Sequence, residues 1–415
     1  MQTFTLVFLF FLTATSLIQI WLSFRQSRHV AQYRAAVPEE FAGKISLQEH
    51  QKAADYTRVK GSFGRMEVIL NIVLVLLWTI GGGLAFLDQL VRGFGWSELI
   101  TGTAVILAMG FIASLIDLPA SLYRTFVIEA QFGFNKLTLK TLFIDTIKTT
   151  LVSLIIGVPL IFLILWLMES AGDFWWLYAW ATLTLFSLLM FWAYPKFIAP
   201  IFNKFTPLEE GEVKERIEAL LSRTGFNSQG VFVMDGSRRS SHGNAYFTGF
   251  GENKRIVFFD TLLEHLSAAQ VEAVLAHELG HFKRKHIVKQ MLLTTLMTLL
   301  GFAVLASAMQ QEWFYSSLGI TQASTYMALI LFMLVSPVFT FFIGPAMSWL
   351  SRKNEFEADE FAAEQSSAEE LISALVGLYK ENASTLTPDP VHSAFYDSHP
   401  PASIRIAHLK RQMET

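Results

Sequence analysis

The chain has 415 residues, of which 52% are hydrophobic and only 16% charged. Soluble domains average about 25% charged residues, so this composition indicates a membrane protein rather than one large soluble core. A formal net charge of −3 is too small to indicate binding to nucleic acid, and the absence of cysteine excludes disulfides, thiolate zinc sites and cysteine nucleophiles.

Seven stretches of the chain are long and apolar enough to cross a bilayer. They lie at residues 4–21, 68–87, 99–116, 149–168, 174–194, 290–309 and 325–350. The first has no basic segment before it and no convincing small-residue cleavage site, so we expect a retained span rather than a signal peptide. Residues 81–83 are all glycine and permit a bend or a close helix approach, and Pro337 and Pro345 predict a kink or break near the inner end of the last span.

Lys and Arg are distributed very unevenly between the loops. The segments 24–65, 121–148, 196–286 and 351–415 together carry 30 of these residues, whereas the alternating segments 91–98, 169–173 and 310–324 carry 1. Because basic loops stay on the cytoplasmic side of a membrane, we expect the N-terminus outside, the C-terminus inside and segment 196–286 in the cytoplasm.

Segment 196–286 is a polar insert with mixed local structure. A strand is predicted at residues 230–234, and two further runs at 244–247 and 255–259 predict a β-hairpin. The helix that follows, residues 267–285, begins with a capping box in which Gln270 can reach back to the amide of Ser267.

This helix contains His277-Glu278-Leu279-Gly280-His281, an H-E-x-x-H sequence. The spacing places the two imidazoles one turn apart on one helix face, where they can share a tetrahedral zinc ion. Glu278 lies one step round the helix, within reach of a water in the open coordination position. Gly280, a poor helix former, indicates that another segment passes close to the metal. A basic amphipathic helix with incidental histidines is the alternative interpretation.

A zinc site of this type needs a third protein ligand. Glu355 and Asp359 are four residues apart, and therefore on one helix face, where the last span leaves the membrane. Glu355 can be the third ligand, and Asp359 can accept a hydrogen bond from the far nitrogen of a ligating imidazole. The alternative is an ordinary solvated acidic face that also includes Glu357 and Glu360.

The other histidines of the cytoplasmic segments have no supporting motif. His286, at the end of the motif helix, is expected to meet lipid headgroups. His265, His392 and His408 are expected at the surface.

Several blocks of the sequence resemble the integral-membrane zinc metalloproteases typified by the type I CAAX prenyl endopeptidase, and they occur in that family's order. They are YRTFVIE at 123–129, GFNK at 133–136, RSSHGNAYF at 239–247, AHELGHF at 276–282, EFEAD at 355–359 and SHPP at 398–401. The resemblance implies a mainly α fold, in which a ring of seven long transmembrane helices encloses a large chamber and a cytoplasmic zincin-like domain with a small β-hairpin caps it.

The resemblance also implies a metal site and a catalytic base. His277, His281 and Glu355 would bind one Zn²⁺ per chain, and Glu278 would be the general base. On this basis we divide the chain into residues 1–195 with spans 1–5, residues 196–286 with the metalloprotease insert, residues 287–350 with spans 6–7, and residues 351–415 with the third ligand.

Three further residues receive roles from the same resemblance. Asp359 matches an acid that is either a proton donor or placed behind a ligand, and we favour the second role because it lies a full turn beyond Glu355. His399 and Asn244 would stabilise the tetrahedral intermediate and hold the peptide. The strand around 244–247 is the candidate edge strand for pairing with an extended substrate.

The expected function is zinc-dependent hydrolysis of peptide bonds at the cytoplasmic membrane face. The expected substrates are lipidated peptides that lose a C-terminal tripeptide, or related peptides, with membrane lipids as partners. One alternative is a quality-control membrane metalloprotease of the heat-shock type. The other is a non-enzymatic transporter or scaffold with a degenerate site, which the nearly uncharged spans disfavour.

The sequence departs from the family pattern in two ways. Glu357 occupies a position that is usually uncharged in the family, which makes the acidic cluster denser. The chain is compact and residues 412–415 contain no recognisable endoplasmic-reticulum retention signal, so we favour a bacterial homologue in the inner membrane, with the endoplasmic-reticulum membrane as the location in a eukaryote.

Overall fold

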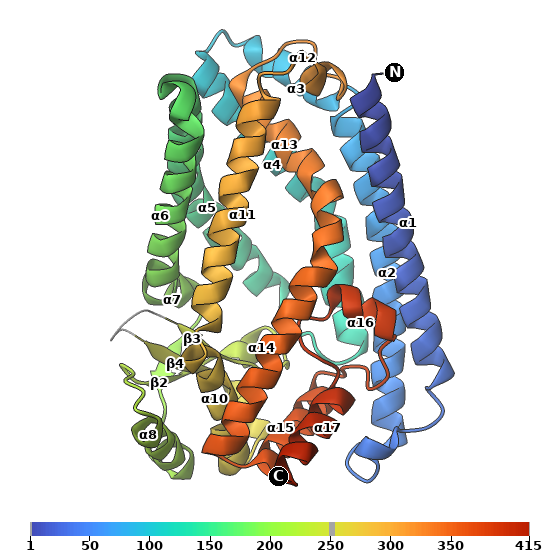
Figure 1. Ribbon diagram of the computed structural model, residues 1–415, viewed down its shortest axis with the longest axis vertical. Helices are drawn as coiled ribbons and strands as arrows, with labels where there is room; N and C mark the ends of the chain where they lie inside the picture. Colours follow the sequence, from blue (N-terminus) through green and yellow to red (C-terminus); the bar gives the residue numbers. More distant parts are fainter. Residues whose placement is uncertain (1, 249–253, 415) are drawn as a thin grey trace.

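Seven long helices dominate the computed structural model, which describes residues 2–248 and 254–414 (Figure 1). They are α1 (Thr3–Gln32), α2 (Leu47–Trp78), α4 (Glu98–Tyr123), α5 (Leu139–Ser170), α6 (Trp175–Ala193), α11 (His286–Ala308) and α13 (Thr325–Thr340), which continues as α14 (Gly344–Gln365). Each contains a window long and apolar enough to cross a membrane. All seven predicted spans are thus confirmed as helices.

The ends of some spans differ from the prediction. The second span was expected to reach residue 87, but α2 ends at Trp78 and the short α3 (Gly83–Arg92) follows. Gly82 between them has a φ of +79°, a conformation that glycine adopts without the cost a side chain imposes. The predicted break in the last span is confirmed by the 3₁₀ turn Phe341–Ile343, which precedes Pro345.

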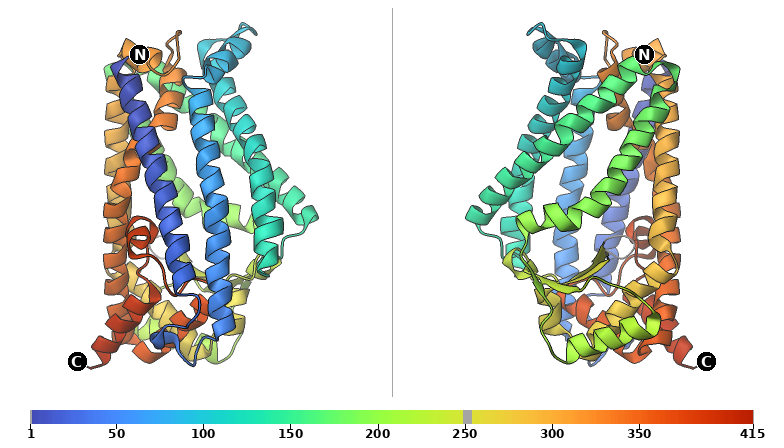
Figure 2. Two further views of the ribbon diagram at one scale, coloured as in Figure 1. Left: turned by 90° about the vertical axis from the view of Figure 1, so that its right-hand side faces the viewer. Right: turned by 90° about the vertical axis from the view of Figure 1, so that its left-hand side faces the viewer.

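The seven helices form a ring rather than a solid bundle (Figures 1 and 2). Around the ring, α1 contacts α2 and α13, α11 contacts α13 and α6, and α5 contacts α6 and α4. Only 6 to 33% of the most apolar window of each helix is buried. A helix at the centre of a bundle would be buried on all sides, so the expected ring of seven helices is confirmed.

Most of the remaining elements gather at the end of the ring opposite the N-terminus (Figure 1). They include a four-stranded sheet of order β1-β2-β4-β3, made of β1 (Phe205–Pro207), β2 (Val231–Met234), β3 (Ala245–Thr248) and β4 (Arg255–Phe259). The antiparallel pairing of β3 with β4 confirms the predicted hairpin strands; the turn between them lies outside the described residues. The sequence did not predict β1, a three-residue strand ending in proline.

Seven helices complete this cap in the described residues, and another short helix, α12 (Glu312–Ser316), lies at the opposite end of the ring near α3 (Figure 1). Those of the cap are α7 (Ala199–Phe202), α8 (Glu212–Thr224), α9 (Asp260–His265), α10 (Ala268–Lys283), α15 (Ala368–Glu381), α16 (Pro390–Tyr396) and α17 (Ala402–Met413). The predicted capping box starts α10. The backbone amide of Ser267 donates to Gln270 Oε1 over 2.9 Å, and the backbone amide of Gln270 donates to Ser267 Oγ over 3.2 Å. Because α8, α14 and α15 all pack on α10, the helix that carries H-E-x-x-H is held at the centre of the cap.

Candidate metal centre and peptide cleft

The crossing of α10 and α14 places the two halves of the predicted metal site face to face. Gly280 in α10 lies against the backbone of Ala358 in α14, and a Cβ built on Gly280 would be 2.8 Å from the Ala358 Cα. Real Cβ atoms do not approach backbone so closely. The expectation that a segment passes close to Gly280 is confirmed, and that segment is the helix that carries Glu355.

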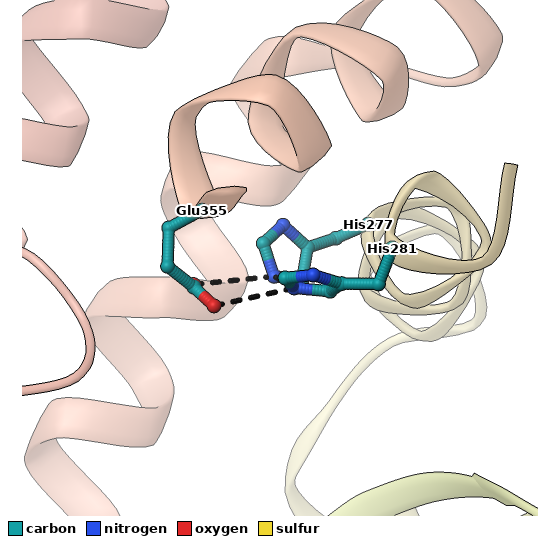
Figure 3. Close-up of side chains that lie close together, drawn as sticks. All are labelled: His277, His281 and Glu355. Atoms are coloured by element: carbon teal, nitrogen blue, oxygen red, sulfur yellow. Dashed lines mark hydrogen bonds and ion pairs between the residues drawn. The ribbon is translucent and has the colours of Figure 1, made fainter. Parts of the chain in front are cut away.

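His277, His281 and Glu355 converge between these helices (Figure 3). Their potential ligand atoms all lie within 4.8 Å of one another. The Nε2 atom of His277 is 3.5 Å from Glu355 Oε2, and that of His281 is 3.2 Å from Glu355 Oε1. With Glu355 3% exposed, the alternative of a solvated acidic face is wrong for this residue.

The arrangement fits a divalent cation. The Nε2 atoms of His277 and His281 face each other at 3.2 Å, and Glu355 Oε2 is buried with no hydrogen-bond partner. Burial and the charge of Arg405 lower the pKa of His277, but the nearby carboxylates of Asp359 and Glu355 outweigh them and raise this pKa to about 9. Two imidazoles and a carboxylate are a ligand set that zinc prefers, and they leave a fourth position open.

Asp359 lies directly behind His277. Its Oδ1 atom is 2.9 Å from His277 Nδ1, on the side of the ring away from Glu355 Oε2. Arg405 of α17 binds the same carboxylate, donating from Nε to Oδ2 over 2.8 Å, and its Nη1 atom is 3.4 Å from Glu355 Oε2. Asp359 is fully buried, so Arg405 supplies the positive charge that balances a carboxylate held away from water.

The sequence prediction did not include Arg405. Its position on an otherwise apolar helix face is the sequence feature from which a role for Arg405 could have been predicted. Arg405 shares the buried side of α17 with Ala402, Ile406 and Leu409, and a charged residue on such a face requires a buried partner.

The expectation that His286 meets lipid headgroups is wrong. Its residue is 4% exposed, its Nδ1 atom lies 3.0 Å from His281 Nδ1, and its Nε2 atom lies 3.0 Å from Glu357 Oε2. The cause is Lys285, whose φ of 58° ends α10 and turns the chain, so that α11 begins with His286 packed against His281.

The other three histidines differ in their surroundings. His265 is exposed as expected, near Glu381. The expected surface position is wrong for His392, which lies partly buried with a buried Nδ1 atom, and for His408, whose side chain is 16% exposed and faces Glu360. His392 lies in α16 and His408 in α17, and the packing of these C-terminal helices cannot be predicted from local sequence patterns.

Glu278 lies in a cleft of about 690 Å³ beside the converging ligands. Tyr246 and Phe247 of β3 line one side of the cleft. Other lining residues belong to the membrane helices, and they include Phe191, Met291 and Met347. Since β3 is at the edge of the sheet, no other strand of the described residues pairs with its outer side, and residues of β3 and of the membrane helices line the same cleft.

The two remaining predicted residues, His399 and Asn244, lie at different distances from the metal centre. His399 is 63% exposed at its side chain, and its Nε2 atom lies 3.4 Å from Glu355 Oε1, at the open side of the metal centre. Asn244 directly precedes β3, and its Oδ1 atom accepts a hydrogen bond from the Ala245 amide over 2.8 Å. It is thus exposed at the start of the edge strand and not in contact with the three converging ligands.

Comparison with known families accounts for nearly the whole chain. Residues 26–204 match the family model described as CAAX prenyl protease N-terminal, five membrane helices. Residues 207–413 match the model of peptidase family M48. The chain belongs to peptidase family M48. Within M48 it falls among the type I CAAX prenyl proteases, because the first of these models covers most of its membrane half.

Individual relatives agree with this assignment. CAAX prenyl protease 1 of Saccharomyces cerevisiae is 34% identical over 94% of this chain and 91% of its own length. The rice homologue is 36% identical over 96% of both chains, and the human homologue is 33% identical over 95% and 93%. The crystal structure of S. mikatae Ste24p superposes with a TM-score of 0.91 at 32% identity, over 99% of each chain. This M48 protein is therefore a membrane zinc metalloendopeptidase, and the non-enzymatic alternative is wrong.

Proposed function

We propose that this peptidase cleaves lipidated peptides near their C-terminus at the cytoplasmic face of the membrane. The observation that carries the proposal is the composition of the cleft. Glu278 and the edge strand residues Tyr246 and Phe247 share it with side chains of the membrane helices, among them Met291 and Met347. A peptide can pair with the strand edge while an apolar group attached to it reaches the ring.

His277, His281 and Glu355 are the proposed zinc ligands. Their convergence within 4.8 Å supports this role. When bound there, zinc acts as a Lewis acid that polarises the substrate carbonyl and lowers the pKa of the attacking water. Asp359 accepts the His277 Nδ1 proton and so fixes the tautomer that leaves Nε2 free for the metal. Its position behind His277 at 2.9 Å favours this role over that of proton donor.

Glu278 is the proposed general base. It takes a proton from the attacking water and returns it to the leaving amine, so that both bond making and bond breaking are assisted by one carboxylate. The side chain of His399, exposed beside Glu355, donates to the oxyanion as it develops. Asn244, at the start of β3, holds the peptide against the strand edge.

The proposed orientation places the metal centre in the cytoplasm. The N-terminus lies at the end of the molecule opposite the cap (Figure 1), and the four segments 24–65, 121–148, 196–286 and 351–415 carry 30 of the 32 Lys and Arg residues. Basic loops stay on the cytoplasmic side. A bacterial inner membrane is the favoured location. The match to the CAAX prenyl protease N-terminal model supports a CAAX-type protease over a quality-control protease of the heat-shock type.

The test is cleavage of a farnesylated C-terminal peptide by the detergent-purified protein, beside the same peptide without lipid. Chelator-sensitive cleavage of only the lipidated peptide is the expected result. Equal cleavage of both peptides would agree with metalloprotease activity but refute the preference for lipidated substrates. Many dispersed cuts in unfolded membrane proteins would favour a quality-control protease instead.

A further inference from the structure

The two imidazoles of the metal centre are supported from behind in different ways. His277 Nδ1 faces a carboxylate directly, that of Asp359 at 2.9 Å. His281 Nδ1 instead faces a second imidazole, with Nδ1 of His286 at 3.0 Å. The other nitrogen of His286 lies 3.0 Å from Glu357 Oε2. His281 is thus connected to a carboxylate through an intervening histidine.

The contact between two ring nitrogens has a defined direction. A neutral imidazole that binds a metal through Nε2 carries its proton on Nδ1. His281 Nδ1 must then donate, and His286 Nδ1 must accept. The proton of His286 is left on Nε2, which is the atom that faces Glu357. The donors therefore point in one direction, from the metal ligand through His286 to a carboxylate.

We propose that His286 and Glu357 are positioning residues that fix the tautomer and ring orientation of His281 and so increase zinc affinity. This inference rests on the proposed metal site. In this arrangement, three carboxylates of α14 have three tasks: Glu355 faces the metal, Asp359 supports His277, and Glu357 supports His281 through His286.

The contact between His281 and His286 is buried, unlike a contact between surface side chains. His286 is 4% exposed, and its ring packs against that of His281 with centroids 5.1 Å apart. Among the described residues, His281 Nδ1 is the hydrogen-bond partner of His286 Nδ1. A charged acceptor strengthens such a hydrogen bond to about twice that of a neutral one, so the carboxylate of Glu357 has a different effect from an amide at the same position.

The experiment measures the zinc dissociation constant of the detergent-purified protein by competition with a chromophoric chelator. Glu357→Leu and His286→Phe are expected to weaken zinc binding by roughly 10–100-fold, and Glu357→Gln by a smaller factor because the amide oxygen still accepts. Glu360→Gln is the matched control. It removes the same charge from the same helix, but its partner is His408, so zinc affinity should not change.

A second readout does not depend on affinity. The d–d absorption of the cobalt-substituted protein should shift in Glu357→Leu, at a side chain that is 31% exposed, and should stay unchanged in Glu360→Gln. Equal zinc affinity and equal spectra of these two variants would overturn the inference while leaving the metal site intact. A wild-type protein that binds no zinc would overturn both proposals.

Discussion

Gly280 and Ala358 are in backbone contact at the point where the H-E-x-x-H helix crosses α14. A Cβ on Gly280 would lie 2.8 Å from the Ala358 Cα and 3.0 Å from its carbonyl oxygen. The contact sets the separation of the two helices that supply His277 and Glu355. Whatever moves these helices apart also moves the metal ligands apart.

Gly280→Ala should therefore reduce both stability and zinc content. Backbone cannot move aside as the end of a flexible side chain can, and we expect a loss of about 1–3 kcal/mol from overpacking. Gly301→Ala in α11 is the control, because its Cβ would meet only the ring of Phe332 at 3.9 Å. Thermal unfolding in detergent that leaves the two variants equally stable would contradict this account.

Glu278→Gln should abolish cleavage and leave zinc bound. The amide cannot accept the proton of the attacking water, and loss of a general base costs typically 10²–10⁴-fold in rate. Zinc content by atomic absorption and cleavage rate should be measured on the same preparation. Loss of the metal from this variant would refute the division between ligands and base.

His281→Ala should remove the metal. The variant leaves only two of the three converging ligands, His277 and Glu355, fewer than a zinc site of this kind needs. The control is His265→Ala, which removes an exposed imidazole near Glu381 and should retain one zinc per chain. Full stoichiometric zinc in His281→Ala would exclude this site.

Arg405→Met should destabilise the cap by about 3–5 kcal/mol, the usual cost of leaving a buried charge unpaired. Asp359 is 0% exposed and would lose both hydrogen bonds from the guanidinium. Arg411→Met on the same helix removes an exposed charge and should change stability little. A similar unfolding temperature for the two variants would show that Asp359 does not depend on Arg405.

The stability that Asp389 contributes to the fold should be lost in acid. Burial opposes its ionisation, but hydrogen bonds from Arg25 and the His392 amide outweigh burial and hold the pKa of Asp389 below its ordinary value. A carboxyl whose pKa is lower in the folded state stabilises the fold above about pH 4, its unfolded pKa, and this contribution is lost as the pH falls further. The unfolding temperatures of wild type and Asp389→Asn should therefore differ at pH 6 and converge towards pH 3. A difference that persists unchanged in acid would exclude this linkage.

Local patterns account for much of the fold. Hydropathy located all seven spans because a bilayer imposes a length and an apolar composition on any helix that crosses it. The capping box of Ser267 and Gln270 is likewise formed within a few residues and was predicted. Local patterns failed for β1, whose three residues form a strand only by pairing with Val233 and its neighbours. The glycine run that permits a bend was recognised, but hydropathy alone extended the second span past the turn at Gly82.

The sequence by itself determined the membrane class, the helix that carries His277 and His281, and the residues expected to complete a zinc site. The first two follow from composition and from spacing within single elements, and the full ligand set is what the family resemblance implied. Only the tertiary structure decided that Arg405, His286 and Glu357 support those residues, because they meet through packing between helices distant in the chain. A buried charge or imidazole takes its role from its partners, and these partners are brought together only when α10, α14 and α17 pack.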